Sequence, residues 1–375
     1  MPDKPRPHRQ PSPRRLFGIA VAGAVISFIL TLSFGFADHA PAPHGVRLAV
    51  AAPAPFADEL SAGLAHAAPG GFTVVTVPSA QDAIGSVRSQ STAGGLVAGA
   101  TGPVTIVTAG AAGPSQQQAI TAALTAAATA AHRQVRPLDV APLPSSDRAG
   151  LSAFVFELGL LIPSVIGGIG LFLVGKRFRV WWRISAGLLF ALLAACGSVL
   201  VLDTIFGALT GASAALIGVG FLGSFAFVAF VAACQAVVGL PGTGLAALAF
   251  VFIGNAASGG TVAFPFLPDG FRQLAPWLPN GAIVSAARDV VYLPDAGLVH
   301  PLLVLAIWLA GSLAVLCGVD LLHLAERRHR PEREAEIFAT PGTVHIRQRI
   351  ARRQAAALSG APSPATGRLA LLRPR

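Results

Sequence analysis

Ionisable residues are rare in the long apolar stretches of this sequence, and those present are the first candidates for chemistry. Three acids fall inside such stretches: Glu157, Asp203 and Asp320. A carboxylate in a membrane span is costly and often marks a proton or ion pathway. None of the three lies at the centre of its stretch, where ion-driven carriers place their coupling groups. We expect Asp203 and Asp320 to be solvated end groups. For Glu157, a candidate intramembrane polar residue, an end group and a functional group both remain open.

Two motif matches suggest nucleotide binding at first sight. Residues 170–176 fit GxxxxGK, but Arg177 stands where a phosphate-binding loop needs a Ser or Thr to hold magnesium. Residues 218–223 fit GxGxxG, yet they lie within an apolar stretch with no soluble strand before them. Close helix packing explains these glycines better. We therefore expect no bound cofactor.

The remaining reactive residue types indicate neither catalysis nor a metal site. Cys196, Cys234 and Cys317 lie in apolar stretches without CxxC spacing. The histidines of segment 38–149 lack ligand-like spacing; they are His39, His44, His66 and His132. We find no Ser/His/Asp set, HExxH pattern or carboxylate pair that would face one side of a membrane. The sequence predicts a protein that is not an enzyme and holds no metal.

Transmembrane helices are the elements that must position these residues. Hydrophobic residues make up 53% of the 375 residues and charged residues only 12%, outside the range of soluble globular proteins. Six stretches approach the roughly 20 apolar residues that a span needs. They cover 16–37, 151–174, 184–206, 212–234, 237–256 and 298–322. Pro241, Gly242 and Gly244 interrupt the fifth stretch, which predicts a short or broken helix there. The expected fold class is an α-helical integral membrane protein with six transmembrane helices.

The positions of the basic residues determine the expected orientation. A net charge of +10 could by itself indicate nucleic-acid binding. However, most of the 27 Lys and Arg residues lie in three segments. Five are in the basic tail 1–15, four in the loop after the second span and eleven in the tail 323–375. The positive-inside rule places these segments in the cytoplasm. We expect a multi-pass protein of the cell membrane with both termini cytoplasmic and no nucleic-acid partner. The Arg-rich tail would contact anionic membrane lipid or a cytoplasmic partner.

The first span is followed by a segment that can fold outside the membrane. Gly35-Phe36-Ala37 resembles a signal-peptide cleavage site, but the apolar core before it is longer than the 7–15 residues of secretory signals, which favours an uncleaved helix at 16–37. In segment 38–149, β-rich runs alternate with helical stretches. The runs are 46–51, 72–77, 94–100, 104–110 and 134–141, and the helical stretches are 56–67, 79–90 and 115–132. This alternation predicts a small extracytoplasmic α/β domain between helices 1 and 2.

The outer segment 257–295 is the most informative part of the sequence. It contains helical patterns at 271–278 and 281–292 that are too short to span a membrane and too apolar for an ordinary loop. We expect them to lie in the interface or to form a re-entrant segment. Arg288 in this segment either snorkels to the surface or requires a carboxylate, a phosphate or water as a partner. The acids nearest to it in sequence are Asp269, Asp289 and Asp295.

Several short motifs accompany this order of segments: DRAGLS (147–152), GNAASGG (254–260) and PWLPNGA (276–282), followed by Ala287-Arg288. With these motifs, the chain resembles the ABC type-2 transporter permease superfamily, in particular its phage-infection-protein-like and DUF3533-type membrane proteins. The resemblance implies one anchor, an outer domain and a five-helix permease-like membrane domain at 150–322. It also implies an outer gate made of Asn255, Ser258, Gly259, Gly260, Pro276, Trp277, Pro279 and Arg288.

The loop after the second span is the expected contact with a separate ATP-binding subunit. By resemblance, this coupling loop contains Lys176, Arg177, Arg179, Trp181, Trp182 and Arg183. The two tryptophans alternatively anchor a helix at the lipid headgroups. The implied function is outward movement of a hydrophobic or amphipathic substrate by a homodimer, with energy supplied in trans. The alternative function is that of a non-transporting cell-envelope protein whose outer domain binds or scaffolds.

Overall fold

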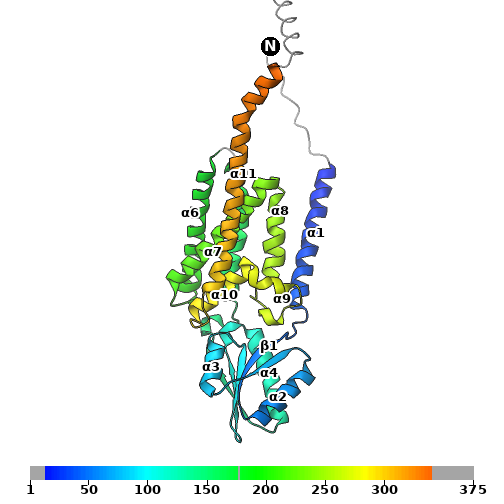
Figure 1. The fold of residues 1–375 in the computed structure, drawn as a ribbon, viewed down its shortest axis with the longest axis vertical. Helices are drawn as coiled ribbons and strands as arrows, with labels where there is room; N and C mark the ends of the chain where they lie inside the picture. Colours follow the sequence, from blue (N-terminus) through cyan, green and yellow to red (C-terminus); the bar gives the residue numbers. More distant parts are fainter. Residues whose placement is uncertain (1–12, 176–177, 340–375) are drawn as a thin grey trace, which may run out of the picture. The chain divides into compact units, whose positions relative to one another are not determined.

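The computed structural model describes residues 13–175 and 178–339, which form a multi-pass helical membrane protein with a small α/β domain (Figure 1). The chain divides into two compact units, Met1–Leu316 and Cys317–Arg375. The α/β domain and all contacts and cavities discussed below belong to the first unit. Of the Arg-rich tail, residues 340–375 lie outside the described part of the chain.

Among the described residues, five helices are long and apolar enough to cross a membrane. They are α1 (Pro13–Asp38), α5 (Ser152–Gly175), α6 (Val180–Val199) with its continuation η3 (Leu200–Ile205), α7 (Ser213–Val238) and α11 (Val299–Ala339). The apolar part of α11 ends at Leu322. These helices coincide with five of the six predicted spans.

The remaining predicted span, 237–256, forms a short helix. After a turn at Gly239, where φ is +76°, the chain forms α8 (Gly242–Ala247) and continues as η4 (Leu248–Gly254). These six and seven residues extend about 20 Å, whereas the hydrocarbon core of a bilayer is about 30 Å thick. The late start agrees with the predicted interruption, because proline and glycine delay helix formation after the turn.

Helix α7 forms the centre of the membrane domain. In its most apolar stretch, 61% of the residues are buried. The corresponding share is 28% for α5 and only 6% for α1. The glycines of the GxGxxG match lie on this helix, where a Cβ at Gly220 would be 2.9 Å from the Phe156 ring and one at Gly223 would be 2.5 Å from Ile283. The interpretation of this motif as a packing feature is therefore confirmed for two of its three glycines, since small residues allow close helix approach.

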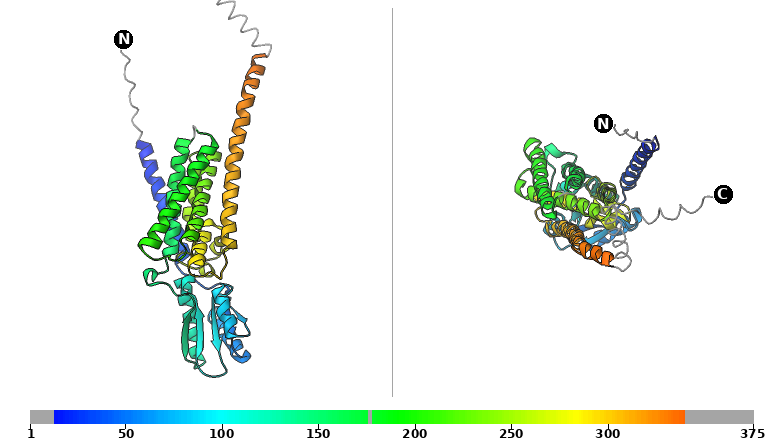
Figure 2. Two further views of the ribbon diagram at one scale, coloured as in Figure 1. Left: turned by 90° about the vertical axis from the view of Figure 1, so that its left-hand side faces the viewer. Right: turned by 90° about the horizontal axis from the view of Figure 1, so that it is seen from above.

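Helix α1 stands at the edge of the helices in both views of Figure 2. Its attachment is at one end, where the Ser33 hydroxyl donates to the carbonyl oxygen of Phe252 at 2.5 Å and the Thr261 hydroxyl donates to Asp38 at 3.1 Å. Most of its described apolar side chains are exposed, including Phe28 at 67%. This face is left for lipid or for a second protein chain.

The α/β domain contains a five-stranded sheet in the order β2-β1-β3-β4-β5. The strands are β1 (Val46–Ala51), β2 (Phe72–Thr76), β3 (Gly94–Ala98), β4 (Val104–Thr108) and β5 (Val135–Asp139), and the helices are α2 (Ala54–Ala67), α3 (Ala80–Arg88) and α4 (Pro114–Ala130). All eight correspond to predicted elements. Neighbouring strands are parallel except for β3 and β4, which are antiparallel. Leu60 of α2 and Ile120 of α4 pack on one face of the sheet, and Val87 of α3 packs on the other.

The domain shares a hydrophobic core with the outer segment of the membrane domain. Leu48, Ile106 and Ile120 of the domain belong to the same buried cluster as Ala257 and Phe266. The outer segment contains η5 (Phe264–Phe266), α9 (Phe271–Leu274), η6 (Ala275–Trp277) and α10 (Pro279–Val291). The two short helices predicted at 271–278 and 281–292 are thus present as α9 with η6 and as α10. Because the core is continuous, the domain is packed onto this segment and is not a separately tethered lobe.

The DRAGLS motif forms the covalent joint between the domain and α5. Both carboxylate oxygens of Asp147 accept backbone N–H groups, from Leu151 at 3.1 Å and from Ser152 at 3.2 Å. This arrangement caps the amino end of α5. Gly150 has a φ of +64°, and a Cβ there would lie 2.6 Å from Pro114 of α4. The motif is explained by helix capping and close packing.

Candidate functional site

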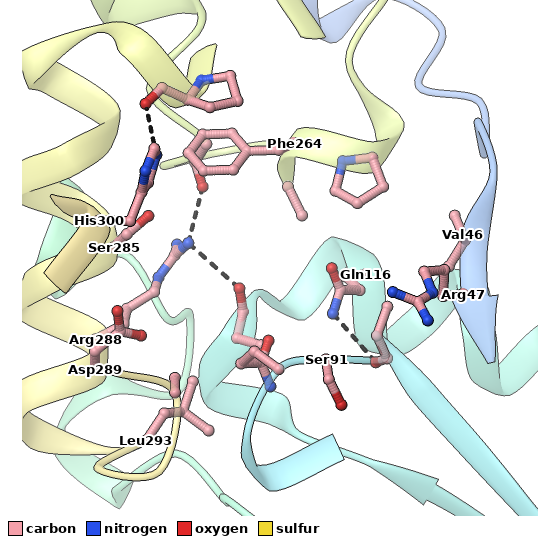
Figure 3. A pocket seen from close by; sticks show the side chains of 18 of the residues that line it. Val46, Arg47, Ser91, Gln116, Phe264, Ser285, Arg288, Asp289, Leu293 and His300 are labelled. Atoms are coloured by element: carbon pink, nitrogen blue, oxygen red, sulfur yellow. Dashed lines mark hydrogen bonds between the residues drawn. The ribbon is translucent and has the colours of Figure 1, made fainter. Parts of the chain in front are cut away.

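A cavity of about 590 Å³ lies between the α/β domain and the outer segment (Figure 3). The domain contributes Arg47, Gln90, Ser91 and Gln116, and the other wall includes Phe264, Arg272, Ser285, Arg288, Asp289 and His300. Three arginines line this cavity, whereas Asp289 is the acid among its described lining residues. The cavity therefore combines polar side chains with an excess of positive charge.

Arg288 lies in one wall of the cavity, and its guanidinium is held by backbone carbonyl oxygens. Its Nη1 donates to Gly259 at 2.9 Å and to Ala112 at 3.3 Å, and its Nη2 donates to Gly260 at 3.1 Å. The side chain is only 7% exposed. The expectation of surface snorkelling is wrong, and the direct partners within the described chain are carbonyl oxygens and not a carboxylate. Asp269, one of the expected partners, pairs instead with Arg272 at 2.5 Å.

The turn at Ser258–Gly260 explains why an arginine is required at this position. Gly259 has a φ of +72°, and a Cβ there would lie 2.5 Å from the Phe264 ring, while one at Gly260 would overlap the ring of Phe154. The Ser258 hydroxyl accepts the N–H of Gly260 at 3.2 Å. The tight turn leaves two successive carbonyls facing α10, and the planar fork of an arginine can bind both.

Burial changes the ionisation of the side chains around Arg288. It raises the pKa of Asp289 to about 7, against an opposing effect of the Arg288 charge. Burial lowers the pKa of Arg288 to about 10, against the attraction of Asp147 and Asp289. Arg288 thus stays charged at neutral pH, whereas Asp289 gains its negative charge as the pH rises through neutrality. The electrostatic potential of the cavity consequently depends on pH in this range.

The other predicted gate residues gather around the start of α10. Pro279 is the first residue of that helix, and Asn255 is buried at the end of the η4 helix. The carbonyl oxygen of Pro276 contacts His300 Nε2 at 3.0 Å, and that of Trp277 accepts the Trp308 indole N–H at 2.8 Å. The structure brings the eight predicted residues together at the end of the membrane domain that packs against the α/β domain. The gating role of this group remains a prediction.

An apolar groove of about 520 Å³ lies between α7, α8 and α11. Its lining includes Phe230, Cys234, Val238, Leu245, Ile307 and Trp308. Trp308 of this groove and His300 of the basic cavity both lie on α11. They are eight residues apart, which corresponds to about 12 Å along the helix axis. The basic cavity and the apolar groove thus occupy neighbouring levels of α11.

Glu157 is fully buried, so the interpretation of this acid as a solvated end group is wrong. Its carboxylate accepts the side-chain N–H of Asn280 at 2.5 Å, and the same amide donates to the carbonyl oxygen of Phe250 at 3.2 Å. Asp203, in contrast, lies at the carboxyl-terminal end of its helix and accepts the Ser213 hydroxyl. Asn280 lies within the PWLPNGA motif, but the sequence shows no sign of its contact with an acid 123 residues away.

The predicted coupling loop is described only in part. Lys176 and Arg177 lie outside the described residues, and Arg179 precedes the first residue of α6. The side chains of Trp181 and Trp182 are 69% and 64% exposed. Their exposure suits both an interfacial anchor and a contact with another subunit, and both interpretations stay open.

No protein-family model, curated protein or solved structure matches this chain. The function is therefore argued from the residues and their geometry.

Proposed function

We propose that this chain is a permease subunit of the ABC type-2 kind, which moves an amphipathic molecule outward across the cell membrane. The observation that carries the proposal is the basic cavity beside the apolar groove, both on α11. An anionic headgroup suits the arginines of the cavity, because guanidinium groups bind phosphate and carboxylate strongly. An acyl chain suits the groove beside Trp308. The protein acts as a carrier and not as an enzyme.

Six crossings of the membrane are part of this proposal. The short helix formed by α8 and η4 starts beside Cys234, near the end of α7, because a Cβ on Gly242 would overlap the Cys234 carbonyl. It ends at Gly254, beside Asn280 of the outer segment. A short crossing is tolerated where the bilayer thins or flanking residues extend to the interface. With this crossing, both termini lie in the cytoplasm, in agreement with the charge distribution of the sequence.

Energy for transport comes in trans, from a separate ATP-binding subunit at the Trp181-Trp182 end of α6. The pathway is completed by a second copy of the chain, and the exposed α1 provides apolar surface for that contact or for lipid. Affinity purification from the native membrane should recover an ATPase in a fixed ratio. Its repeated absence would favour the alternative of a non-transporting envelope protein, which agrees with the close packing of the domain on the outer segment.

Tryptophan quenching by brominated lipids tests ligand binding directly. Replacing Trp181 and Trp182 with Phe leaves Trp277 and Trp308, next to the cavity and the groove. In vesicles, brominated phosphatidylglycerol should quench these two residues more strongly than brominated phosphatidylcholine at equal mole fraction. Combined Arg47→Ala and Arg272→Ala changes should remove the difference. Arg136→Ala is the matched control, because Arg136 is exposed on β5 and does not line the cavity. Equal quenching by the two lipids would contradict an anionic headgroup site.

A further inference from the structure

Glu157 and Asn280 form a polar pair inside the apolar core of the membrane domain. Both side chains are 0% exposed. Phe156, Leu160, Phe250 and Ile283, all buried, belong to the cluster that surrounds them. A polar pair in such a place is expensive unless its hydrogen bonds are satisfied.

The orientation of the Asn280 amide is defined by its neighbours. Its Nδ2 lies 2.5 Å from Glu157 Oε1 and 3.2 Å from the carbonyl oxygen of Phe250. A backbone carbonyl only accepts hydrogen bonds, so the NH₂ group must face it. The amide oxygen then points toward Gly254, where a Cβ would overlap it. Gly254, the last residue of η4, leaves the space that the amide requires.

Two oxygens of this pair are left over. Within the described chain, neither Glu157 Oε2 nor Asn280 Oδ1 has a hydrogen-bond partner. If Glu157 is a carboxylate, both atoms are acceptors and neither can satisfy the other. If Glu157 carries a proton on Oε2, that atom becomes a donor, and Asn280 Oδ1 is the acceptor on the amide that it already faces.

No described cation neutralises Glu157. Helix α10 carries Arg288 and Asp289, eight and nine residues beyond Asn280, and the Arg288 guanidinium is occupied by three carbonyl oxygens. Other ionisable side chains on the packed elements are Cys234 toward the far end of α7, Arg183, Cys196 and Asp203 on α6 and η3, and His300 at the start of α11, whose Nε2 contacts the carbonyl oxygen of Pro276; α8 and η4 contain none. An ionised Glu157 would therefore be a buried charge without a counter-ion.

We propose that Glu157 and Asn280 form a proton-binding site inside the membrane domain. In the proposed protonated state, Glu157 is a neutral acid, and a ring of two hydrogen bonds joins α5 to α10. The amide N–H donates to Oε1, and the acid O–H donates to the amide oxygen. Loss of the proton to water breaks the second bond and leaves a charge between the two helices. Proton binding thus controls one of the polar contacts between α5 and the helix that carries Arg288.

This site is independent of what the outer cavity binds. Glu157 lies five residues after the first residue of α5, about 8 Å along the helix from its outer end. Protons can therefore exchange with the outer medium over a short distance. The pair remains a proton site whether the chain transports an amphipathic molecule or only binds one, and its test requires neither transport nor a ligand.

Infrared spectroscopy of the full-length protein in lipid nanodiscs tests the proposal. At neutral pH, the wild type should show a carboxylic-acid carbonyl band that disappears in Glu157→Gln. The band should persist in Glu59→Gln, the same change at an exposed position of α2. If Glu157→Gln lost a carboxylate band and no carboxylic-acid band, the proposal would be overturned.

Thermal melting provides a second measurement. Glu157→Gln should melt within about 2 °C of the wild type, because a glutamine amide reproduces the two-bond ring. Glu157→Ala and Asn280→Ala should each lower the melting temperature clearly, by about the same amount as the double mutant, since either change removes the whole ring. A metal cation is the alternative occupant of the site. If the wild type melted at a higher temperature in sodium chloride than in choline chloride, and Glu157→Gln did not, the site would bind a metal cation and the proposal would be overturned. Additive effects of the two alanine changes would also overturn it.

Discussion

The guanidinium of Arg288 donates to the carbonyl oxygen of Ala112, which lies 176 residues earlier in the chain and 3.3 Å away. Ala112 ends the short helix η1 (Gly110–Ala112) of the α/β domain, and Arg288 lies on α10 of the outer segment. Through its bonds to Gly259 and Gly260, the same guanidinium also holds the turn between the short helix η4 and the outer segment. One side chain thus connects three parts of the protein.

Replacing Arg288 with Ala should destabilise the protein strongly. Two buried carbonyl oxygens and one partly buried one would lose their donor, and each unsatisfied buried group costs about 1–3 kcal/mol. We expect Arg288→Ala to reduce both expression and the melting temperature in detergent, and Arg288→Lys to recover only part of the loss, because an ammonium cannot replace the planar fork. The exposed Arg136→Ala change is the control. Wild-type melting of Arg288→Ala would show that these three bonds contribute little.

The glycines of α7 allow a matched pair of substitutions within one motif. Gly223→Ala should destabilise by about 1–3 kcal/mol, because the new methyl group would collide with Ile283. Gly218→Ala should be neutral or slightly stabilising, since no atom lies within 4 Å and alanine favours the helix. Urea or thermal unfolding of the two variants measures the difference. Equal effects would mean that helix packing at Gly223 is looser than described.

Binding of an anionic lipid should weaken as the pH rises through neutrality. The pKa of Asp289 is raised by burial to about 7, so the cavity gains a negative charge above that pH and repels the headgroup. Quenching by brominated phosphatidylglycerol should therefore be stronger at about pH 6 than at about pH 8. Asp289→Asn should remove most of this pH dependence while keeping the binding observed at low pH. A pH dependence that survives in Asp289→Asn would assign it to another group.

Replacing Trp181 and Trp182 with Ala distinguishes the two interpretations of the coupling loop. If this end of α6 contacts an ATPase, the double mutant should insert normally but lose the recovered partner and transport. If the tryptophans only anchor the helix at the headgroups, partner recovery should be unchanged. The side chains are exposed, so the substitution should not disturb the core. A melting temperature equal to that of the wild type confirms that the variant is folded.

Cysteine labelling checks the orientation. In a background without Cys196, Cys234 and Cys317, an impermeant reagent added from outside should modify Asp269→Cys in the outer segment and Ser115→Cys in the α/β domain. It should modify Arg179→Cys only after the membrane is permeabilised. Modification of Arg179→Cys in intact cells would reverse the topology and remove the proposed contact with a cytoplasmic ATPase.

The elements of the fold were largely predictable, because they depend on local patterns. Hydropathy located the long helices, and the alternation in segment 38–149 located all five strands and three helices of the domain. The antiparallel pairing of β3 and β4 was not predicted, although the short connection at 99–103 carries the signal: parallel strands need a crossover of a dozen residues or more.

The site was predicted only where its residues are neighbours in sequence. The motifs at 254–260 and 276–282 supplied seven of the eight predicted gate residues, which the structure brings together. Arg47 and Gln116, which line the opposite wall of the cavity, were not identified, because nothing in the α/β domain marks which side chains face the outer segment. The Glu157–Asn280 contact depends on how α5 and α10 pack, and a single sequence contains no pattern for that.

The continuous core of the α/β domain and the outer segment has a consequence for biogenesis. The strands of the domain are synthesised first, but Ala257 and Phe266, which complete their core, follow only after α5, α6, α7 and the short helix. Until then, part of the apolar face of the domain stays uncovered. The domain therefore completes its folding late, and it needs protection from proteases and from self-association while the membrane helices are inserted.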